Sequence, residues 1–217
     1  ATDASTMALM MGQRRSSASG NFVNGRLEGY GRDVMSWSEY EGEFVNGLWE
    51  GQGKLTFYED SYNSKNIGNI SSVMEANFKQ GLADGFCTIY YQNTAAYRYT
   101  GPIKDGNLEG TGEIEFLDGS KLRGNFRNGK MEGEGAITFA NGDKFSGMYA
   151  DGKPVKGTLY YYSGSKYVGA MSVREENDKI TGKPVQVYIR QGKGTMTDKD
   201  GRTYTVNCEN NTCTETY

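Results

Sequence analysis

A glycine-aromatic unit of 22 or 23 residues recurs through the chain and constrains its fold more than any other feature. Its clearest copies are YTGPIKDGNLEGTGEIEFLDG from Tyr99, LRGNFRNGKMEGEGAITFANG from Leu122 and FSGMYADGKPVKGTLYYYSG from Phe145. One glycine position returns at steps of 23, 23 and 22 residues, as Gly101, Gly124, Gly147 and Gly169. Self-similarity with a period of about 20–50 residues marks a chain built from stacked units.

Each copy has the pattern of a β-hairpin. In its second half Gly112, Ile114 and Phe116 alternate with Glu113 and Glu115, which is the period of a half-buried strand. Asp-Gly or Asn-Gly steps lie between the two halves, and they suit the positive φ angles of tight hairpin turns. We therefore predict an all-β chain of about seven stacked hairpins.

Aligning the copies places the large apolar residues in four columns, which we expect to form the core. The first contains Tyr40, Met74, Tyr99, Leu122, Phe145, Tyr167 and Tyr204, and the second Phe22, Phe44, Phe78, Ile103, Phe126, Tyr149 and Met171. The third contains Leu55, Ile89, Ile114, Ile137, Leu159 and Met196, and the fourth Phe57, Tyr91, Phe116, Phe139 and Tyr161. Because a single hairpin cannot hide its apolar face, each column is expected to pack against neighbouring copies.

These residues resemble the MORN repeat (membrane occupation and recognition nexus), whose pattern is roughly Y-x-G-x-F-x-x-G-x-x-x-G-x-G-x-x-x-F-x-x-G. The likeness extends from about Gly20 to Tyr204, with strict spacing in the copies from Tyr40, Tyr99, Leu122 and Phe145. The resemblance implies an elongated, twisted single-layer sheet of hairpins with a groove along one face. It also implies a scaffold, a partner-binding module or a membrane-associated module, so we predict no enzymatic activity and no cofactor.

The predicted organisation has three parts. Residues 1–19 form an N-terminal extension that is docked on a partner or disordered, residues 20–204 form the repeat domain, and residues 205–217 form a final half repeat. Insertions interrupt the repeat at 58–73 and 174–191, and the copy from Met74 has Ala76 and Cys87 at glycine positions. We expect specific recognition at these irregular copies.

The composition excludes several kinds of site. The chain has no histidine and only three cysteines, so a Ser-His-Asp or Cys-His pair within it is impossible, and a closed zinc site is not expected. The formal net charge of −3 gives no general attraction for phosphate. We therefore expect no nucleic-acid partner, and the charge does not favour lipid headgroups, the alternative partner that the family name suggests.

Cysteines bear on the compartment in which the protein functions. Cys208 and Cys213 enclose four residues, and they are either two free thiols or a disulfide, which would imply an oxidising compartment. Cys87 is expected to be structural. The chain begins at Ala1, which is consistent with removal of a targeting peptide and leaves an organelle or another compartment open.

An acidic stripe is expected where the residue before one turn glycine is acidic in five copies. These residues are Glu28, Glu50, Asp84, Glu109 and Glu132. The stripe could be a docking strip for a basic segment or a weak cation site. A solvated face that keeps an exposed edge from pairing with other sheets is the simpler interpretation, and we prefer it.

Aromatic residues outside the four columns are the better candidates for partner contacts. They are Trp37, Trp49, Tyr58, Tyr62, Tyr90, Tyr97, Tyr160 and Tyr162, and from them we select Trp37, Trp49, Tyr58, Tyr90, Tyr160 and Tyr162. Trp and Tyr are enriched at binding hot spots because they bury a large area at low entropic cost. Ordinary packing on the second face of the sheet is the alternative.

The sequence therefore predicts a non-catalytic scaffold, an accessory subunit of a larger assembly that holds a partner polypeptide along an aromatic groove. The alternative is a peripheral membrane or cytoskeletal module that contacts phospholipid headgroups.

Overall fold

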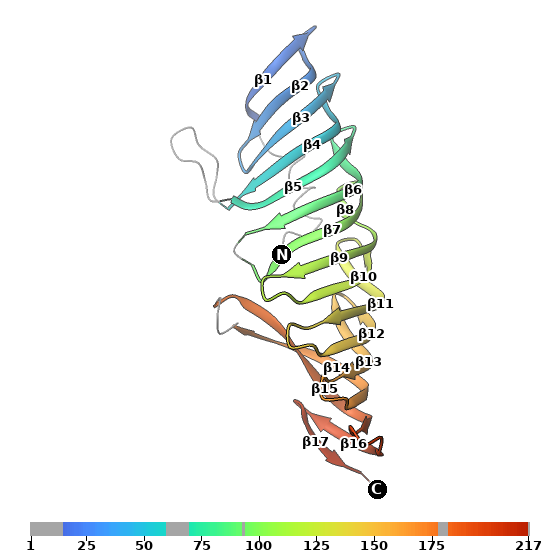
Figure 1. Ribbon diagram of the computed structural model, residues 1–217. Helices are drawn as coiled ribbons and strands as arrows, with labels where there is room; N and C mark the ends of the chain where they lie inside the picture. The colour runs from blue at the N-terminus through green and yellow to red at the C-terminus, as the bar shows by residue number, and fades with distance from the viewer. Residues whose placement is uncertain (1–14, 60–69, 93, 178–181, 217) are drawn as a thin grey trace. The chain divides into compact units, whose positions relative to one another are not determined.

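The structure is a computed structural model that describes residues 15–59, 70–92, 94–177 and 182–216 of the 217-residue chain. Within these residues the chain forms seventeen β-strands and no helix (Figure 1). The all-β prediction is confirmed. Most of the predicted N-terminal extension and of the first insertion, including Tyr62, lies outside the described residues.

The strands divide into two compact units, each of which is described by itself. Most of the described residues up to Gly112, together with 127–129, belong to the first unit, and residues 94–96, 113–126 and those from Lys130 onward belong to the second.

The first unit is an antiparallel succession of strands. They are β1 (Arg15–Val23), β2 (Arg26–Met35), β3 (Ser38–Val45), β4 (Leu48–Tyr58), β5 (Ile70–Lys79), β6 (Leu82–Tyr91), β7 (Ala96–Lys104), β8 (Asn107–Leu108) and the beginning of β9 (Gly110–Phe116). Each strand from β1 to β7 pairs with the one that follows it.

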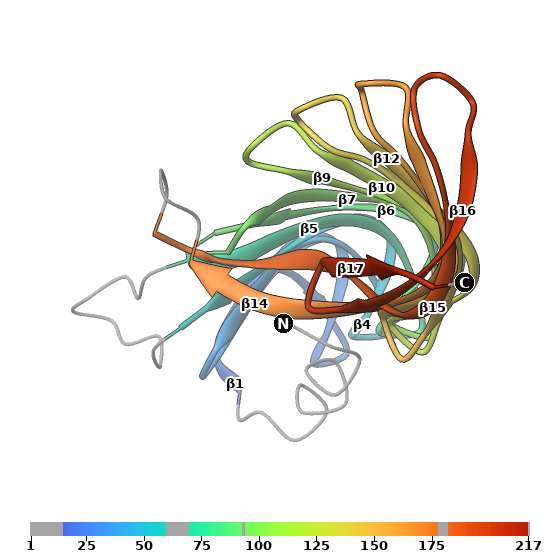
Figure 2. The same ribbon diagram turned by 90° about the horizontal axis from the view of Figure 1, so that it is seen from below.

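The second unit continues the same pattern. Its strands are the rest of β9, then β10 (Lys121–Arg127), β11 (Lys130–Thr138), β12 (Lys144–Ala150), β13 (Lys153–Tyr160), β14 (Lys166–Asn177), β15 (Pro184–Thr197), β16 (Thr203–Glu209) and β17 (Thr212–Glu215). Each strand from β11 to β16 pairs with the next one in antiparallel fashion. The strands of the unit curve along their length (Figure 2).

Two-residue turns close seven hairpins in the described part of the chain. Both residues of each turn have positive φ, at Asn24-Gly25, Asn46-Gly47, Gln80-Gly81, Asp105-Gly106, Asn128-Gly129, Asp151-Gly152 and Asn210-Asn211. This combination is that of a type I′ turn, for which Asn-Gly and Asp-Gly are suited. The β14–β15 hairpin of the interrupted copy has a longer connection. Counting one hairpin for each repeat copy, the described residues form eight where about seven were predicted.

One face of each unit is built from two neighbouring rows that cross the strands. The ring row carries the large side chains: Tyr40, Leu55, Met74, Ile89 and Tyr99 in the first unit, and Ile137, Phe145, Leu159, Tyr167, Met196 and Tyr204 in the second. The glycine row beside it contains Gly31, Gly42, Gly53, Ala76, Cys87 and Gly101, then Gly135, Gly147, Gly157, Gly169 and Gly194. The first and third predicted columns thus alternate within one row.

Strand glycines are required because aromatic rings lie flat on them. A Cβ at Gly42 or Gly53 would meet the Tyr40 ring inside the 3.0 Å limit of real Cβ contacts. The Tyr40 ring lies over both glycines. Its hydroxyl donates a hydrogen bond to the Glu43 carbonyl at 3.1 Å, next to a shift in the β3–β4 register. Burial raises the pKa of this hydroxyl, which therefore stays a donor.

The same arrangement recurs at two other ring-row tyrosines. Tyr99 covers Gly101 and Gly112, and Tyr167 covers Gly169 and Gly194. Their hydroxyls donate to the carbonyls of Pro102 at 3.1 Å and of Ala170 at 3.2 Å. These copies thus join a tyrosine to two glycines and to the carbonyl group three residues further along its own strand.

The irregular copy from Met74 follows from this contact. Met74 replaces the tyrosine, and the two positions that it faces carry Ala76 and Cys87, both buried. Without a ring lying on the sheet, a Cβ is tolerated at both positions. The missing ring therefore explains why this copy has lost both glycines.

Most of the predicted core columns are buried, with one clear exception. The first-column residues from Tyr40 to Tyr167 are at most 9% exposed, but the second-column residue Phe22 is 51% exposed. It lies on β1, the first described strand, and the core prediction is wrong there because its burial would require a strand on each side. In the fourth column only Phe57 is buried, and the other four are half-buried.

Residues of the second insertion extend the β14–β15 hairpin, whose ends reach beyond the neighbouring strands in Figure 2. Tyr188 of this extension packs edge-on against Phe139 and Tyr149 and contacts Phe145, with ring centroids 5.2–6.5 Å apart. Its hydroxyl lies 3.0 Å from that of Tyr149. The insertion therefore covers part of the ring-row face of its own unit.

Candidate partner-binding site

The acidic stripe is a set of links between successive hairpins. Four of its carboxylates accept a backbone N–H from the first turn residue of the next hairpin: Glu28 from Asn46 (2.9 Å), Glu50 from Gln80 (3.0 Å), Glu109 from Asn128 (3.2 Å) and Glu132 from Asp151 (2.8 Å). Gln191 does the same for Asn210 at 3.3 Å. Asp84 holds the equivalent place with a side chain one methylene shorter.

A second bond completes each link. The next amide of the turn donates to the carbonyl of the residue before the acid, as from Gly47 to Leu27 and from Gly81 to Trp49, both at 2.9 Å. The stripe was predicted to be a solvated face, with a docking strip as the alternative. The four glutamates accept these backbone amides in hydrogen bonds on the exposed surface, and each bond ties one hairpin to the next.

Removing one link should measurably weaken the fold. Glu50→Ala leaves the Gln80 amide without its charged acceptor, so we expect the free energy of unfolding to fall by about 1–2 kcal/mol. Glu50→Gln keeps an acceptor oxygen and should lose less. Urea denaturation measures both, with Glu41→Ala on the exposed face of β3 as the control, expected within about 0.5 kcal/mol. An unchanged midpoint for Glu50→Ala would contradict the structural role of the stripe.

Trp49 is a core residue, which corrects its place among the predicted contacts. Its side chain is only 8% exposed, and its ring stacks on Tyr40 with centroids 4.4 Å apart and planes at 10°. It also meets Phe78 edge-on, and its indole N–H donates to Asp33 Oδ2 at 3.4 Å. Trp49 therefore offers no surface to a partner in this structure.

Three other predicted contacts of the first unit lie at the ends of β2–β7 opposite the two-residue turns. Trp37 is 46% exposed, and its carbonyl accepts the Tyr58 N–H at 2.9 Å. Tyr58 pairs with Ile70, which is 40% exposed. Tyr90 meets the 44% exposed Tyr97 edge-on at 6.2 Å. We call Trp37, Tyr58, Ile70, Tyr90 and Tyr97 the loop-end cluster.

Strand β5 connects the two halves of this cluster. Ile70 begins β5 beside Tyr58, and Gln92, just after β6, donates its N–H to the Ser71 carbonyl at 2.8 Å. The Tyr58 hydroxyl donates to Glu39 at 3.2 Å. A hydrogen bond from Arg32 holds the pKa of the Glu39 carboxyl below its usual value, so this carboxylate stays charged beside the cluster.

Tyr160 and Tyr162 belong to the second unit and are described separately. Tyr160 ends β13 and is 46% exposed, and Tyr162 is 85% exposed. The Tyr162 N–H donates to Asp143 Oδ1 at 2.8 Å, which fixes the turn that carries its ring.

Sequence reasoning missed two exposed aromatics of the first unit. Tyr30 and Phe86 are 64% and 63% exposed. Each directly follows a positive-φ glycine, Gly29 or Gly85. That glycine in turn directly follows a residue of the acidic stripe. That spacing was available in the sequence as a signal for an outward-facing position.

The family comparison agrees with the repeat pattern of the sequence. The model of the MORN repeat matches residues 19–32, 40–61, 75–94, 123–144 and 189–201. This chain is a MORN-repeat protein. MORN repeats are generally non-enzymatic modules that bind proteins or lipids. In this MORN protein the repeat's aromatic position supplies the ring row, and its internal glycines supply the row beneath the rings.

Comparison with solved structures gives a weaker likeness. A match described as the "SAS-4 (dCPAP) TCP domain in complex with a Proline Rich Motif of Ana2 (dSTIL) of Drosophila Melanogaster" is 14% identical, covers 92% of each chain and has a TM-score of 0.43. A likeness at that level carries no weight for this MORN protein. No curated protein sequence matches the chain.

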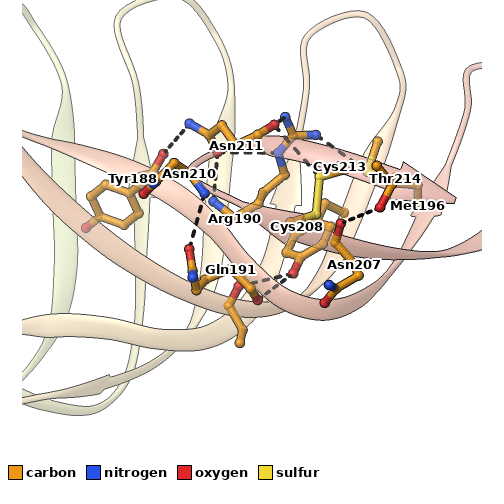
Figure 3. Close-up of a disulfide and its surroundings, with 12 residues drawn as sticks. Tyr188, Arg190, Gln191, Met196, Asn207, Cys208, Asn210, Asn211, Cys213 and Thr214 are labelled. Atoms are coloured by element: carbon orange, nitrogen blue, oxygen red, sulfur yellow. Dashed lines mark hydrogen bonds between the residues drawn. A yellow bond between two sulfur atoms is a disulfide. The ribbon is translucent and has the colours of Figure 1, made fainter. Parts of the chain in front are cut away.

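A disulfide closes the last hairpin of the MORN protein (Figure 3). Cys208 on β16 and Cys213 on β17 face each other and are bonded. The turn between them is held by Arg190, whose backbone N–H donates to Asn211 Oδ1 at 2.7 Å. Cys87 is a buried free thiol, and burial raises its pKa to about 12, so it is not a reactive cysteine.

The described residues offer few groups for other chemistry. They contain no cluster of three or more Cys, Asp or Glu side chains arranged to hold a metal ion. In the same residues no helix is long and apolar enough to cross a membrane.

Proposed function

We propose that this MORN-repeat protein is a non-catalytic scaffold that binds a partner polypeptide through the loop-end cluster, as an accessory subunit of a larger assembly. The observation that carries the proposal is the exposure of Trp37, Ile70 and Tyr97 beside the half-buried Tyr58 and Tyr90. Large aromatic side chains grouped on a surface are typical of binding hot spots.

The repeat itself explains why partner contacts are expected outside its own pattern. The ring-row residues of the first unit are at most 6% exposed, and their contact area is taken up by glycines and neighbouring side chains. The predicted aromatic groove therefore has little free aromatic surface in this unit. Residues of the loop-end cluster lie outside the ring row, and Trp37, Ile70 and Tyr97 are 40–46% exposed, so a partner can reach their side chains.

Phospholipid headgroups are the less favoured ligand for this cluster. The Tyr58 hydroxyl is bonded to the Glu39 carboxylate, and that negative charge disfavours an anionic headgroup. The net charge of −3 disfavours adsorption to an anionic membrane in the same way.

A matched pair of double variants tests the proposal. The partner is first identified by native co-purification with the full chain and mass spectrometry, and its affinity is then measured with purified proteins. Trp37→Ala/Tyr97→Ala should weaken binding about ten-fold or more, because each hot-spot ring contributes on the order of 1 kcal/mol or more. Tyr30→Ala/Phe86→Ala removes two rings outside the cluster that are more exposed than Trp37 and Tyr97, and it should change affinity less than about two-fold.

Equal losses in the two double variants, or no loss in either, would refute the loop-end cluster as the binding surface. Urea denaturation of both variants checks that the fold persists. Flotation with phosphatidylserine vesicles supplies the other arm, because binding to vesicles that disappears at high salt would support the lipid alternative instead.

A further inference from the structure

A second surface with a different character lies on the second unit, on the face opposite its ring row. Lys144, Lys156, Lys166 and Lys193 are all exposed there, on the consecutive strands β12 to β15. We call this surface the lysine face. Tyr160 of β13 lies directly opposite Lys144 on β12 and Lys166 on β14. One exposed ring is therefore flanked by two cations.

No acid lies directly across the strands from any of these four lysines. Across the strands Lys156 pairs with Met148 and Ala170, Lys166 with Thr197, and Lys193 with Asn207. Within the described residues none of the four lysines makes an ion pair. Four like charges on one face repel each other, and an opposite charge from outside would relieve that repulsion.

The corresponding face of the first unit shows what a compensated arrangement looks like. There Arg32 pairs with Glu41, Glu41 with Lys54, and Lys54 with Glu75 across successive strands. Opposite charges alternate along that row, so its charges are balanced within the unit. The lysine face therefore differs in kind from the same face of the other unit.

Apolar groups lie among the lysines. Met148, Tyr160 and Val168 are 37%, 46% and 44% exposed. Hydroxyl side chains of Ser146, Thr158 and Thr195 fill the row between them. The face thus combines a small apolar centre with cations on several sides, and its natural complement has apolar groups flanked by acids.

We propose that the lysine face binds an acidic amphipathic helix of a partner polypeptide. Lys144 and Lys166 are two strands apart, which is about 9–10 Å at the usual strand spacing. A helix presents acids at positions i and i+7 on one side about 10.5 Å apart, with an apolar residue between them to meet Tyr160. The proposal rests on the function as a polypeptide-binding module, but it uses a separate surface.

The bordering charges favour a short acidic segment over a long polyanion. Glu134 lies next to Met148 across β11 and β12. Glu115 of β9 forms an ion pair with Lys121, with 3.1 Å between Glu115 Oε1 and Lys121 Nζ. Nucleic acid or an anionic membrane would extend past the four lysines onto these acids, whereas one helix fits within β12 to β15.

A synthetic peptide tests the face directly. The probe is a fluorescein-labelled helical peptide with glutamates at i and i+7 and leucines at i+3 and i+4, measured by fluorescence anisotropy with the full chain. Lys144→Glu/Lys166→Glu should weaken binding about ten-fold or more, and raising the salt should weaken it for the unaltered chain. Lys79→Glu/Lys104→Glu changes the same charge on the first unit and should alter affinity less than about two-fold.

Each other outcome overturns the proposal. Equal losses of peptide affinity in the two double variants would show that only the net charge of the chain matters. If a peptide with glutamines at i and i+7 bound as tightly as the glutamate peptide, the acids would have no role in binding. Tighter binding of oligothymidine or of phosphatidylserine vesicles would assign the face to those ligands, and a lysine-dependent dimer in sedimentation would assign it to a second copy. Trp37→Ala/Tyr97→Ala should bind the peptide normally, so failure of the loop-end cluster and failure of the lysine face are distinguishable.

Discussion

Replacing Trp49 with alanine is expected to lower the free energy of unfolding by about 3–5 kcal/mol, the usual cost of truncating a buried aromatic side chain. The change removes the stack on Tyr40 and the edge contact with Phe78. It also takes one hydrogen bond from Asp33, a buried carboxylate whose remaining partner is Arg15. Urea denaturation followed by circular dichroism measures the loss.

The other tryptophan of the chain supplies the matched control. Trp37 is 46% exposed where Trp49 is 8% exposed, so Trp37→Ala is expected to change the free energy of unfolding by less than about 0.5 kcal/mol. Similar losses in the two variants would contradict the assignment of one tryptophan to the core and the other to the surface.

The second large effect is expected at the glycine row. Gly42→Ala places a Cβ against the Tyr40 hydroxyl, so the ring must leave its position and its bond to the Glu43 carbonyl. Overpacking costs about 1–3 kcal/mol and the lost hydrogen bond about 1 kcal/mol. We expect a total loss of about 2–4 kcal/mol, measured by urea denaturation.

The copy from Met74 suggests a compensating variant. Tyr40→Met/Gly42→Ala/Gly53→Ala imitates the combination of Met74, Ala76 and Cys87, in which no ring lies on the sheet. It should be more stable than Gly42→Ala alone, because the flexible methionine side chain can move away from the methyl groups added at positions 42 and 53. If the triple variant were less stable than the single one, the ring contact would not be the reason for the glycines.

Trp49 illustrates what the repeat pattern could and could not predict. The hairpins and their turns follow from local chemistry, since Asn-Gly and Asp-Gly steps alone favour the observed positive φ angles. Trp49 was assigned to the surface because it lies outside the four apolar columns. The missed signal is a fifth column before the stripe acids: Leu27, Trp49, Ala83, Leu108 and Met131. Four of these are buried and Leu108 is half-buried.

Stripe glutamates show a different limit of the sequence. Their recurrence was visible, but their role depends on the turn of the next hairpin, 18–30 residues away in the chain. A pattern within one copy cannot reveal a bond between copies. Tyr188 is a similar case, because its partners Phe139 and Tyr149 belong to repeat copies that the insertion meets only after folding.

The sites of proposed binding follow from the same division of roles. Ring-row residues, strand glycines and stripe glutamates are used to hold the sheet together, and they recur because every hairpin needs them. The loop-end cluster and the lysine face consist of residues outside these roles, so we expect substitutions there to leave the repeat folded. Specific recognition is therefore expected where the chain differs from its own pattern.

Side-chain oxidation by hydroxyl radicals, with and without the co-purified partner, tests this division most directly, because it reports the exposure of individual aromatic rings. The predicted result is protection of Trp37 and Tyr97 on binding, with Tyr30 and Phe86 oxidised equally in both states and Trp49 protected in both. Protection of Tyr30 and Phe86 while Trp37 and Tyr97 stay reactive would contradict the proposed binding surface.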